Sequence, residues 1–391
     1  MPGFEKDKLS AIRAVWISGA YGYGGELLYF RDIFAEFSRR FPAGIVPVAR
    51  DFPADHYPDL PLAPILGFHR FGRVRRTVGG VPYVGVRRIP TVASWWRLFR
   101  LRADVFILIE FSPTALVGFL VAKLSGRRTA LLIESDPRYR GAPGGRLSLS
   151  IKRMVVRRVD AVLSSNQIGA RFLREVLGAD PDRITVGPYL TSLPPGADAG
   201  AALRKEHGTR IRLLFLNSVT DRKGLLQLVQ ALEALPEAAR ERWVLDVVGS
   251  GSGLEPVRVA VQALGLSENV IFHGRVPYEE TGKYYAGSDL VVCPTLADYR
   301  SLGGFEAVNA GKPVLVSCYD GAHQEVLASS PAAFLVDPRD RRGFTEVLEQ
   351  LLLNESALRA AQHAAAAVPS PFSVEGVGSN LQRAVLMAVN A

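Results

Sequence analysis

The chain has 391 residues, of which 48% are hydrophobic and 22% charged, with 37 Gly, 25 Pro and two Cys. This composition excludes a disordered chain, a disulfide scaffold and a low-complexity protein, and the length favours two or three domains. The formal net charge of +9 is uneven, because residues 1–200 hold 29 Lys and Arg against 17 Asp and Glu, whereas residues 201–391 hold 18 against 21.

The first half of the sequence alternates apolar runs with helical patterns. Strands are expected at residues 12–18, 105–109, 128–133, 161–165 and 185–186, and helices at residues 114–124 and 168–177. A glycine-rich turn, SGAYGYGGE, follows the first strand and precedes a helix. The apolar side of that helix is formed by Leu27, Phe30, Phe34 and Phe37. Residues 42–64 are Pro-rich and are expected to be irregular.

The longest apolar stretch, residues 105–122, contains Glu110 and Pro113 and therefore predicts a buried strand and a buried helix, not a membrane span. The first thirty residues contain charges of both signs and no long apolar run, so no secretory signal is expected. These observations predict a cytoplasmic protein with reduced thiols.

A second alternating series follows a polar linker at residues 191–210. Strands are expected at residues 211–216, 243–248, 270–272, 290–293 and 314–318, and helices at residues 225–235, 254–264, 278–286, 305–310 and 344–353. A last helix follows Pro371, and its apolar stripe comprises Val374, Val377, Leu381, Val385 and Val389. The predicted fold class is α/β, with two Rossmann-like, doubly wound domains at residues 1–190 and 211–370 and a terminal helix at residues 371–391. Ligands of such sheets bind beyond the carboxyl ends of the strands, so a cleft between the domains is the expected site.

Two glycine-rich turns are candidate anion cradles. Gly22, Gly24 and Gly25 follow the first strand, but Leu27 stands where a dinucleotide fingerprint needs a third small residue, which argues against a nicotinamide enzyme. The run that begins at Gly249, GSGSG, follows a strand of the second half. Each turn is equally interpretable as a tight connection without a ligand.

Charged residues follow two strands of the second half. The turn Asp221-Arg222-Lys223-Gly224 places a cation before a helix, where a phosphate would be stabilised by both, or it is an ordinary charged turn. Asp298 and Glu306 are seven residues apart, and Glu306 is expected to open a short helix. At the start of a helix Glu306 is interpretable as an electrostatic cap. Alternatively, Gly303 and Gly304 let a ligand approach, and Glu306 accepts hydrogen bonds from the hydroxyls of a ribose.

Several kinds of catalytic site are not predicted. The six His show no metal-binding spacing, and no nucleophile elbow or P-loop is present. Cys293 and Cys318 lie in apolar strands and are expected to be inert core thiols.

A series of motifs runs in order through residues 211–342: LLFLNSVTDRKGLLQLVQAL, LDVVGSGSG, VIFHGRVPYEETGKYYAGSDLVVCPT, SLGGFEAVNAGKPVLVS, GAHQEV and FLVDPRD. With these motifs the chain resembles the retaining nucleotide-sugar glycosyltransferases of the GT-B fold, in particular family 4, also called group 1. In the first half, GYGGE and AVLSSNQIGARFL are similar to the first turn and to a later strand and helix of that family. The resemblance implies two Rossmann-like domains facing across a cleft, with the C-terminal helix crossing back to the first domain.

The resemblance also implies roles for individual residues. Glu306 would bind the nucleotide ribose, Asp298 would lie beside the donor sugar, and Lys223 would neutralise the leaving diphosphate. The other donor-binding positions implied are Gly24, Gly25, Ser218, Arg222, Gly249, His273, Gly274, Arg275, Ser301, Leu302 and Gly303. Of these, residues 273–275 would flank the base and the amides of residues 301–303 would contact the sugar and the diphosphate.

Three positions depart from the family pattern. Asn217 and Ser218 stand where the family has an Arg, for which Arg222 would substitute, and Asp298 stands in place of a Glu. The run Glu134-Ser135-Asp136 stands where many relatives have a His, and either of its acids would orient the acceptor. A non-catalytic GT-B scaffold or regulatory subunit is therefore an alternative, as is a GT-B epimerase or phosphorylase.

The implied reaction transfers a sugar from a nucleotide-diphosphate sugar to an acceptor hydroxyl, lipid-linked or saccharide, with retention, in bacterial polysaccharide, glycolipid or glycoconjugate biosynthesis. Because Lys223 and helix amides would stabilise the leaving phosphate, neither a metal nor a cofactor is expected. The basic clusters of the first half are either solvated faces or a surface for an anionic membrane or acceptor. Trp95 and Trp96 beside Arg97 favour an anionic membrane, at its inner face, and no motif predicts nucleic acid.

Overall fold

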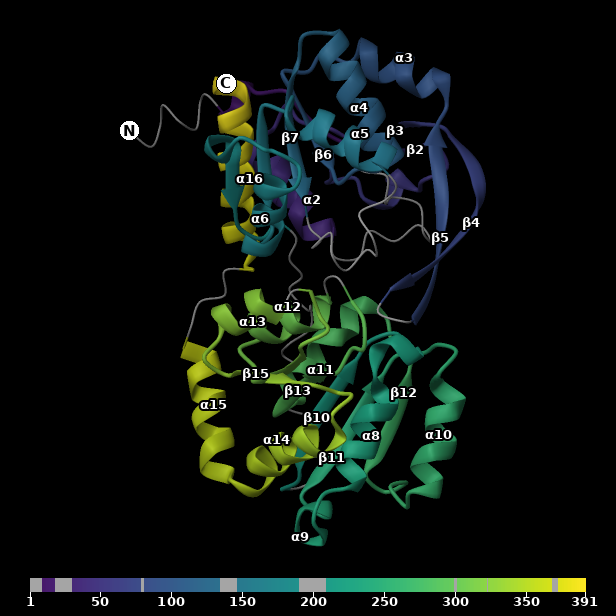
Figure 1. The fold of residues 1–391 in the computed structure, drawn as a ribbon, viewed down its shortest axis with the longest axis vertical. Coiled ribbons are helices and arrows are strands. Elements are labelled where there is room, and N and C mark those ends of the chain that lie inside the picture. The colour runs from purple at the N-terminus through teal and green to yellow at the C-terminus, as the bar shows by residue number, and fades with distance from the viewer. Residues whose placement is uncertain are drawn as a thin grey trace. The chain divides into compact units, whose positions relative to one another are not determined.

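The computed structural model describes residues 9–17, 30–78, 81–133, 146–189, 209–298, 301–321, 323–367 and 372–391. The chain divides into two compact units (Figure 1). Unit 1 comprises Met1–Thr77, Pro82–Thr191 and Val374–Ala391, and unit 2 comprises Val78–Val81 and Ser192–Ser373. Most of the predicted linker, residues 191–210, lies outside the described residues.

Unit 1 is built on a parallel sheet in the order β1-β6-β7-β8-β9. Its strands are β1 (Ala14–Ile17), β6 (Val105–Ile109), β7 (Arg128–Ile133), β8 (Ala161–Ser164) and β9 (Ile184–Val186). Beyond β1, β2 (Val46–Ala49) and β3 (Leu62–Leu66) form a parallel pair that is joined to β1 through a bridge between Val15 and Ile45. The prediction of an irregular segment at residues 42–64 is therefore wrong, because short strands near the edge of a sheet tolerate proline.

A two-stranded sheet of β4 (Phe68–Val78) and β5 (Val81–Pro90) follows, which the sequence does not predict. The helices of unit 1 are α2 (Phe30–Arg40), α3 (Val92–Arg100), α4 (Pro113–Leu124), α5 (Arg146–Val156), α6 (Gln167–Glu175) and α16 (Val374–Asn390). Alternate strand residues point to two cores, so α2 and α16 cover one face of the sheet and α3 to α6 cover the other.

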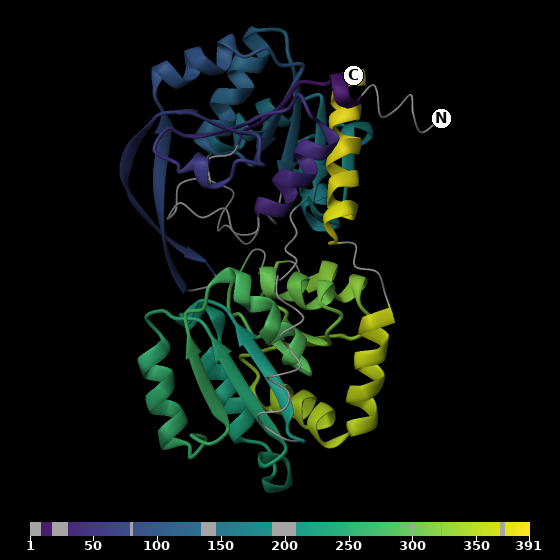
Figure 2. The same ribbon diagram turned by 180° about the vertical axis from the view of Figure 1, so that it is seen from behind.

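The C-terminal helix α16 packs beside α2 within unit 1 (Figures 1 and 2). Its apolar residues Val377, Leu381 and Val385 are fully buried in the core that also contains Phe34 and Phe37. Glu36 of α2 pairs with Arg40, whose Nη1 donates to Gln382 Oε1 at 2.6 Å. The stripe that has no partner in its own part of the sequence is thus buried against the first unit, as the resemblance implies.

Unit 2 is a parallel sheet in the order β12-β11-β10-β13-β14-β15. Its strands are β10 (Ile211–Leu216), β11 (Trp243–Val248), β12 (Val270–Gly274), β13 (Leu290–Cys293), β14 (Val314–Ser317) and β15 (Ala333–Val336). Its helices are α8 (Leu225–Glu233), α9 (Glu237–Arg240), α10 (Leu254–Ala263), α11 (Thr281–Gly287), α12 (Leu302–Asn309), α13 (His323–Ser329), α14 (Arg341–Leu353) and α15 (Glu355–Ala367). No helix in the described part of the chain combines the length and apolar character that a membrane span needs.

Candidate functional site

The charged residues that the sequence singles out in unit 2 lie beyond the carboxyl ends of β10 and β13. From these two central strands the chain order runs outward in opposite directions, through β11 and β12 on one side and β14 and β15 on the other. The connections after β10 and β13 therefore run toward opposite edges of the sheet. This position is a topological switch point, where open α/β sheets bind ligands. Lys223 ends a short 3-10 helix after β10, and Asp298 lies shortly after β13.

Asp298 binds both cations of the charged turn. Its Oδ2 atom lies 2.6 Å from Lys223 Nζ and 2.7 Å from an Arg222 guanidinium nitrogen. Lys223 is 7% exposed and Asp298 is 5% exposed, so water screens this pair little. Together the three side chains have one net positive charge. The burial of Lys223 therefore distinguishes this turn from an ordinary charged turn, whose side chains are solvated.

The two cations keep Asp298 ionised. Burial alone would raise the pKa of Asp298, but the charges and hydrogen bonds of Lys223 and Arg222 outweigh burial and hold this pKa below its usual value. Near neutral pH the carboxylate is therefore a charged partner of the two cations, not a source of protons.

Main-chain contacts fix the charged turn against the loop after β13. Gly224 has a φ of 72°, and a Cβ atom there would lie 1.8 Å from the carbonyl oxygen of Pro294. The Arg222 carbonyl accepts hydrogen bonds from the Leu296 N–H at 2.8 Å and the Thr295 hydroxyl at 2.9 Å. Only glycine fits position 224, because the loop approaches so closely and its φ is positive.

The amino end of α12 is packed on the same two strand ends. A Cβ atom on Gly303 would lie 3.1 Å from Cys293 Sγ and 3.8 Å from the Leu216 carbonyl oxygen. Ser301 precedes Leu302, the first residue of α12, and its N–H lies 3.3 Å from the carboxylate oxygens of Asp320. The Ser301 hydroxyl is buried and has no hydrogen-bond partner among the described residues, so it is a polar group to which a bound ligand could hydrogen-bond.

Glu306 lies in the second turn of α12, because the helix begins at Leu302. The expectation that Glu306 opens the helix is therefore wrong, and the favourable interaction with the amino end of the helix dipole does not explain this acid. Glu306 is buried, and its Oε2 atom accepts a hydrogen bond of 2.6 Å from the hydroxyl of Tyr285 on α11. Burial and then the Glu306 charge raise the pKa of Tyr285 well above its usual value, so Tyr285 stays a donor.

Cys293, the last residue of β13, shows that these groups surround one strand end. Burial raises the pKa of the Cys293 thiol, the charges of Asp320, Glu306 and Asp298 raise it further, and Lys223 opposes them. Asp320 is a fully buried acid that the sequence analysis misses. Its only sequence signal is a position three residues after the end of strand β14, before a glycine.

The glycine turn after β11 lies against the loop after β10. Gly249 has a φ of 145°, and a Cβ atom there would lie 1.9 Å from the Asn217 carbonyl oxygen. Its N–H donates to the Gly274 carbonyl at 2.7 Å, which joins the turn to the end of β12. Ser218, which the resemblance places near the donor, is exposed beside this turn, and its N–H donates to the Asn217 side chain.

His273, at the end of β12, is engaged in a buried ionic network. Its Nε2 atom lies 2.7 Å from Asp246 Oδ1, and Asp246 Oδ2 lies 2.6 Å from a guanidinium nitrogen of Arg212. The next residue, Gly274, has a φ of 70°, and Arg275 is exposed. The network fixes the strand end from which Arg275 projects. Sequence analysis misses Asp246 and Arg212 because each appears as an isolated charge within an apolar strand.

Four of the predicted site residues lie outside the described residues: Gly24, Gly25, Glu134 and Asp136. Unit 1 contains a further acid that the sequence analysis uses only as evidence against a membrane span. Glu110 follows β6, is buried, and has a φ of 57°. A non-glycine residue in the left-handed region is strained, and such residues cluster at functional sites. Glu110 lies at the switch point of the first sheet, because the strand order reverses between β1 and β6.

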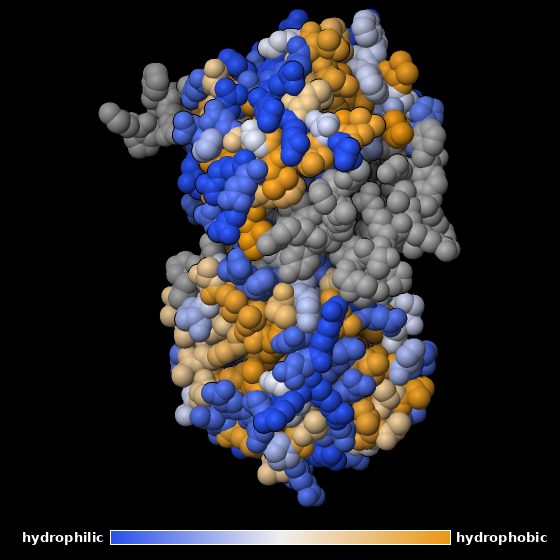
Figure 3. All heavy atoms as spheres, viewed as in Figure 1, coloured by the Kyte–Doolittle hydropathy of each residue, from blue (hydrophilic) through white to orange (hydrophobic). Residues whose placement is uncertain are grey.

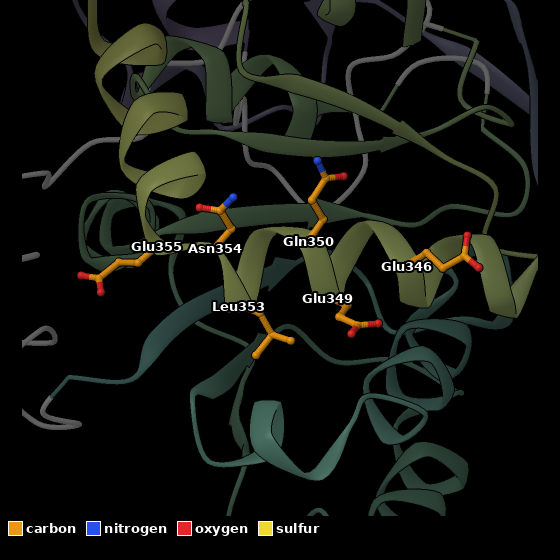
Figure 4. Close-up of a pocket in the computed structure, with 6 residues that line it drawn as sticks. All are labelled: Glu346, Glu349, Gln350, Leu353, Asn354 and Glu355. Atoms are coloured by element: carbon orange, nitrogen blue, oxygen red, sulfur yellow. The ribbon is translucent and has the colours of Figure 1, made fainter.

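An open groove elsewhere on unit 2 lies where α14 meets α15 (Figure 4). The residues that line it are Glu346, Glu349, Gln350, Leu353, Asn354 and Glu355. Figure 4 shows Gln350 and Asn354 pointing to the opposite side of α14 from Glu349 and Leu353, so these side chains do not converge. The Leu353 carbonyl accepts from Arg242, which directly precedes β11, so the groove lies near the amino ends of the strands. Among the described residues, no group of three or more His, Cys, Asp or Glu is arranged to hold a metal ion.

Comparison with known proteins identifies the fold and shows a family similarity of the second unit. HepE from Anabaena, solved in complex with UDP, superposes with a TM-score of 0.72 at 17% identity, covering 96% of this chain and 99% of that chain. Two doubly wound domains with a shared C-terminal helix define the GT-B class, and this chain has that fold. Residues 202–368 match the family model described as Glycosyl transferases group 1. The match lies within the second unit, which is similar to that family.

Two curated relatives are similar over part of their length. The D-inositol 3-phosphate glycosyltransferase of Xylanimonas cellulosilytica is 32% identical over 218 residues, which are 52% of this chain and 51% of that protein. The GDP-mannose-dependent alpha-(1-6)-phosphatidylinositol monomannoside mannosyltransferase of Mycolicibacterium smegmatis is 28% identical over 287 residues, 67% of this chain and 71% of that protein. The chain thus spans about half the length of the D-inositol 3-phosphate glycosyltransferases that it matches.

Proposed function

We propose that the protein is a glycosyltransferase that moves a sugar from a nucleotide-diphosphate sugar to an acceptor hydroxyl with retention of configuration. The observation that carries the proposal is the buried Lys223, which Asp298 fixes beside Arg222 at the switch point of the second sheet. A buried lysine beside a partly exposed arginine, next to a helix amino end and the Ser301 hydroxyl, suits a diphosphate.

The donor class is supported by the related proteins. HepE is solved with UDP and with UDP-glucose, and the mannosyltransferase relative is named as GDP-mannose-dependent. These names share a nucleoside diphosphate linked to a hexose, with two different bases. We therefore assign the donor as a nucleoside-diphosphate sugar.

Each part of the donor has residues of suitable chemistry. The diphosphate is placed at Lys223 and Arg222, with the amides of residues 301–303 and the Ser301 hydroxyl. The ribose is placed at Glu306, whose carboxylate accepts from hydroxyl groups while Tyr285 holds it. The base is placed beside residues 273–275, and the Gly249 turn lets the main chain approach.

The chemistry follows from charge development on the leaving group. As the bond between the sugar and the diphosphate breaks, negative charge grows on the leaving phosphate, and Lys223 stabilises it without reorganisation because Asp298 already fixes its position. The leaving phosphate oxygen takes the proton of the attacking hydroxyl on the same face, which retains the anomeric configuration. Lys223 and Arg222 supply positive charge that a metal would otherwise supply, so the proposed reaction uses neither metal nor cofactor.

The acceptor is proposed to be a lipid-linked or saccharide hydroxyl oriented by Glu134 or Asp136 of unit 1. The biological setting proposed is bacterial polysaccharide, glycolipid or glycoconjugate biosynthesis, with the protein peripheral on the inner face of the membrane. The names of the inositol-phosphate and phosphatidylinositol-mannoside relatives support such acceptors.

Calorimetric titration with UDP and GDP, followed by an assay of nucleoside diphosphate release from a panel of nucleotide sugars, tests the proposal. Binding of one nucleoside diphosphate, together with slow release of the same diphosphate from one sugar donor, supports a transferase. Binding without any turnover on any donor and acceptor indicates a non-catalytic scaffold. Absence of binding to every nucleoside diphosphate rejects the assignment of the site.

A further inference from the structure

Large apolar side chains are exposed in unit 1 on helices that share one side of its sheet. α3, α4 and α5 pack their buried residues into the same core. On their outward side, Val92, Trp95, Trp96 and Phe99 of α3 and Leu120 and Leu124 of α4 are exposed. Figure 3 shows apolar side chains over the part of unit 1 where these helices lie. A contiguous exposed apolar patch on a folded domain marks an interaction site.

The aromatic part of this surface is ordered by its own contacts. The Trp96 and Phe99 rings stack with centroids 5.9 Å apart, and the Arg100 guanidinium lies 4.7 Å from the Trp96 ring. Arg127, which follows α4, donates to the main-chain oxygens of Leu98 at 3.2 Å and Phe99 at 2.9 Å. These bonds hold the end of α3 next to the end of α4, so the exposed side chains of both helices form one surface.

Helix α5 adds a second exposed stripe to the same layer. Leu147, Ile151 and Met154 are exposed at spacings of four and three residues, which places them along one side of the helix. We define the α3–α5 surface as these three residues together with the six exposed apolar residues of α3 and α4. By contrast, the exposed large apolar residues of unit 2, Val259 and Leu353 among them, lie on separate elements.

The charge of the three helices has a single sign. Their sequences, VASWWRLFR, PTALVGFLVAKL and RLSLSIKRMVV, contain no Asp or Glu. Their cations are Arg97, Arg100, Lys123, Arg146, Lys152 and Arg153. Lys123 pairs with Asp160 at 2.8 Å. The other five cations, among exposed apolar and aromatic residues on helices that contain no acid, are complementary to an anionic headgroup layer above an acyl region.

We infer that the α3–α5 surface docks unit 1 on an anionic lipid bilayer, with Trp95, Trp96 and Phe99 entering the headgroup boundary. Amphipathic aromatic side chains favour that boundary, and cations gain from a negative surface potential. A protein partner would be expected to meet carboxylates as well as cations on the docking face, and these helices contain no Asp or Glu. The inference rests on the proposed function only in that a lipid-linked acceptor would lie in the same bilayer, and its test needs no catalysis.

Tryptophan emission in the presence of vesicles tests the inference on the full chain. The protein has four Trp, of which Trp16 and Trp243 are fully buried, whereas Trp95 is 38% and Trp96 is 54% exposed. A blue shift on addition of vesicles therefore reports on α3. We expect cosedimentation and a blue shift with vesicles of phosphatidylcholine and phosphatidylglycerol, and neither with phosphatidylcholine alone.

Two variants with matched controls locate the contact. Trp95→Ala combined with Trp96→Ala, and separately Arg100→Glu, should each lower vesicle partitioning about tenfold or more. Val259→Ala, which removes exposed apolar surface from unit 2, and Arg342→Glu, which makes the same change of charge there as Arg100→Glu, should leave it unchanged. All variants should remain folded, and a cooperative thermal unfolding transition for each variant checks this.

Three results would overturn the inference. One is the absence of binding to anionic vesicles at low salt. Another is vesicle binding that produces no blue shift and that Arg342→Glu weakens as much as Arg100→Glu does. Such binding would indicate attraction by net charge alone. The third is concentration-dependent self-association, seen by light scattering and abolished by the tryptophan substitutions, without vesicle binding, which assigns the surface to a second copy of the chain. Calorimetric binding of a nucleoside diphosphate in any of these cases would leave the proposed transferase reaction standing and would remove only its membrane setting.

Discussion

Substitution of Lys223 by Ala isolates the electrostatic contribution that the proposed reaction needs. Lys223 Nζ lies 2.6 Å from Asp298 Oδ2, and both side chains are almost fully buried. Deleting one preorganised charge at a developing oxyanion typically raises the barrier by about 2–4 kcal/mol. At 1.36 kcal/mol for each factor of ten, we expect kcat to fall roughly 30- to 1,000-fold.

The same substitution should leave the protein folded. A buried carboxylate stranded without any partner costs about 3–5 kcal/mol of stability, but Asp298 keeps Arg222 at 2.7 Å. The loss should therefore be closer to about 1–3 kcal/mol, the cost of one buried hydrogen bond to a charged group. Chemical unfolding of the variant, measured beside its rate of nucleoside diphosphate release, separates the loss of stability from the loss of turnover.

Lys283→Ala is the matched control for a lysine of unit 2. Lys283 pairs with Glu280 at 2.5 Å, but these side chains are 28% and 49% exposed, so the pair contributes less than about 1 kcal/mol. Its kcat should equal that of the wild type. A folded Lys223→Ala protein that turns over as fast as this control would refute the assignment of Lys223 to the leaving group.

Three further substitutions test the surroundings of the site and the stability of each unit. Tyr285→Phe removes the hydroxyl that donates to Glu306. We expect weaker nucleoside diphosphate binding by calorimetry and a loss of about 1.5–3 kcal/mol of stability. Unchanged affinity would contradict the assignment of Glu306 to the ribose. Asp246→Asn removes the negative charge that pairs with the buried Arg212, so urea unfolding should show a loss of about 3 kcal/mol or more. Burial would raise the pKa of Asp160, but its hydrogen bonds hold this pKa below the value of the unfolded chain, so its stabilisation is present above about pH 4 and is lost as the pH falls through the folded pKa. Asp160→Asn should therefore flatten the acid dependence of the unfolding free energy below about pH 4, and an unaltered dependence would contradict this account.

The sequence predicts the parts of the fold that have strong patterns. The central strands of unit 2 are apolar apart from Arg212 and Asp246, and the predicted bounds of β10, β11 and β13 are those of the structure. β15 and α15 are not predicted, because the strand is short and partly exposed and the helix is rich in Ala without a wide apolar stripe. β4 and β5 are rich in Arg and Gly, so their period of two is weak in the sequence.

The candidate site is predictable where a motif defines it and not where contacts do. Lys223, Asp298 and Glu306 are found from their positions after strands and from the resemblance. Asp320 and Tyr285 are not found, because each becomes part of the site only through packing against α12. The bounds of α12 decide the environment of Glu306, and helix bounds are what sequence patterns determine least well.

The contacts of Asp298 explain how loops from two strands hold the positive charges of Lys223 and Arg222 in one ordered site. Lys223 and Asp298 lie in loops that follow two different strands, β10 and β13. Neither loop alone would hold the flexible lysine side chain in place. The Arg222 carbonyl accepts from Thr295 and Leu296, which aligns the two loops, and Asp298 then binds both side chains. Charge held in place before substrate arrives need not reorganise when the leaving group forms, which is the condition for electrostatic stabilisation to lower a barrier. Asp298 is therefore as necessary to the proposed chemistry as Lys223, although it supplies no proton.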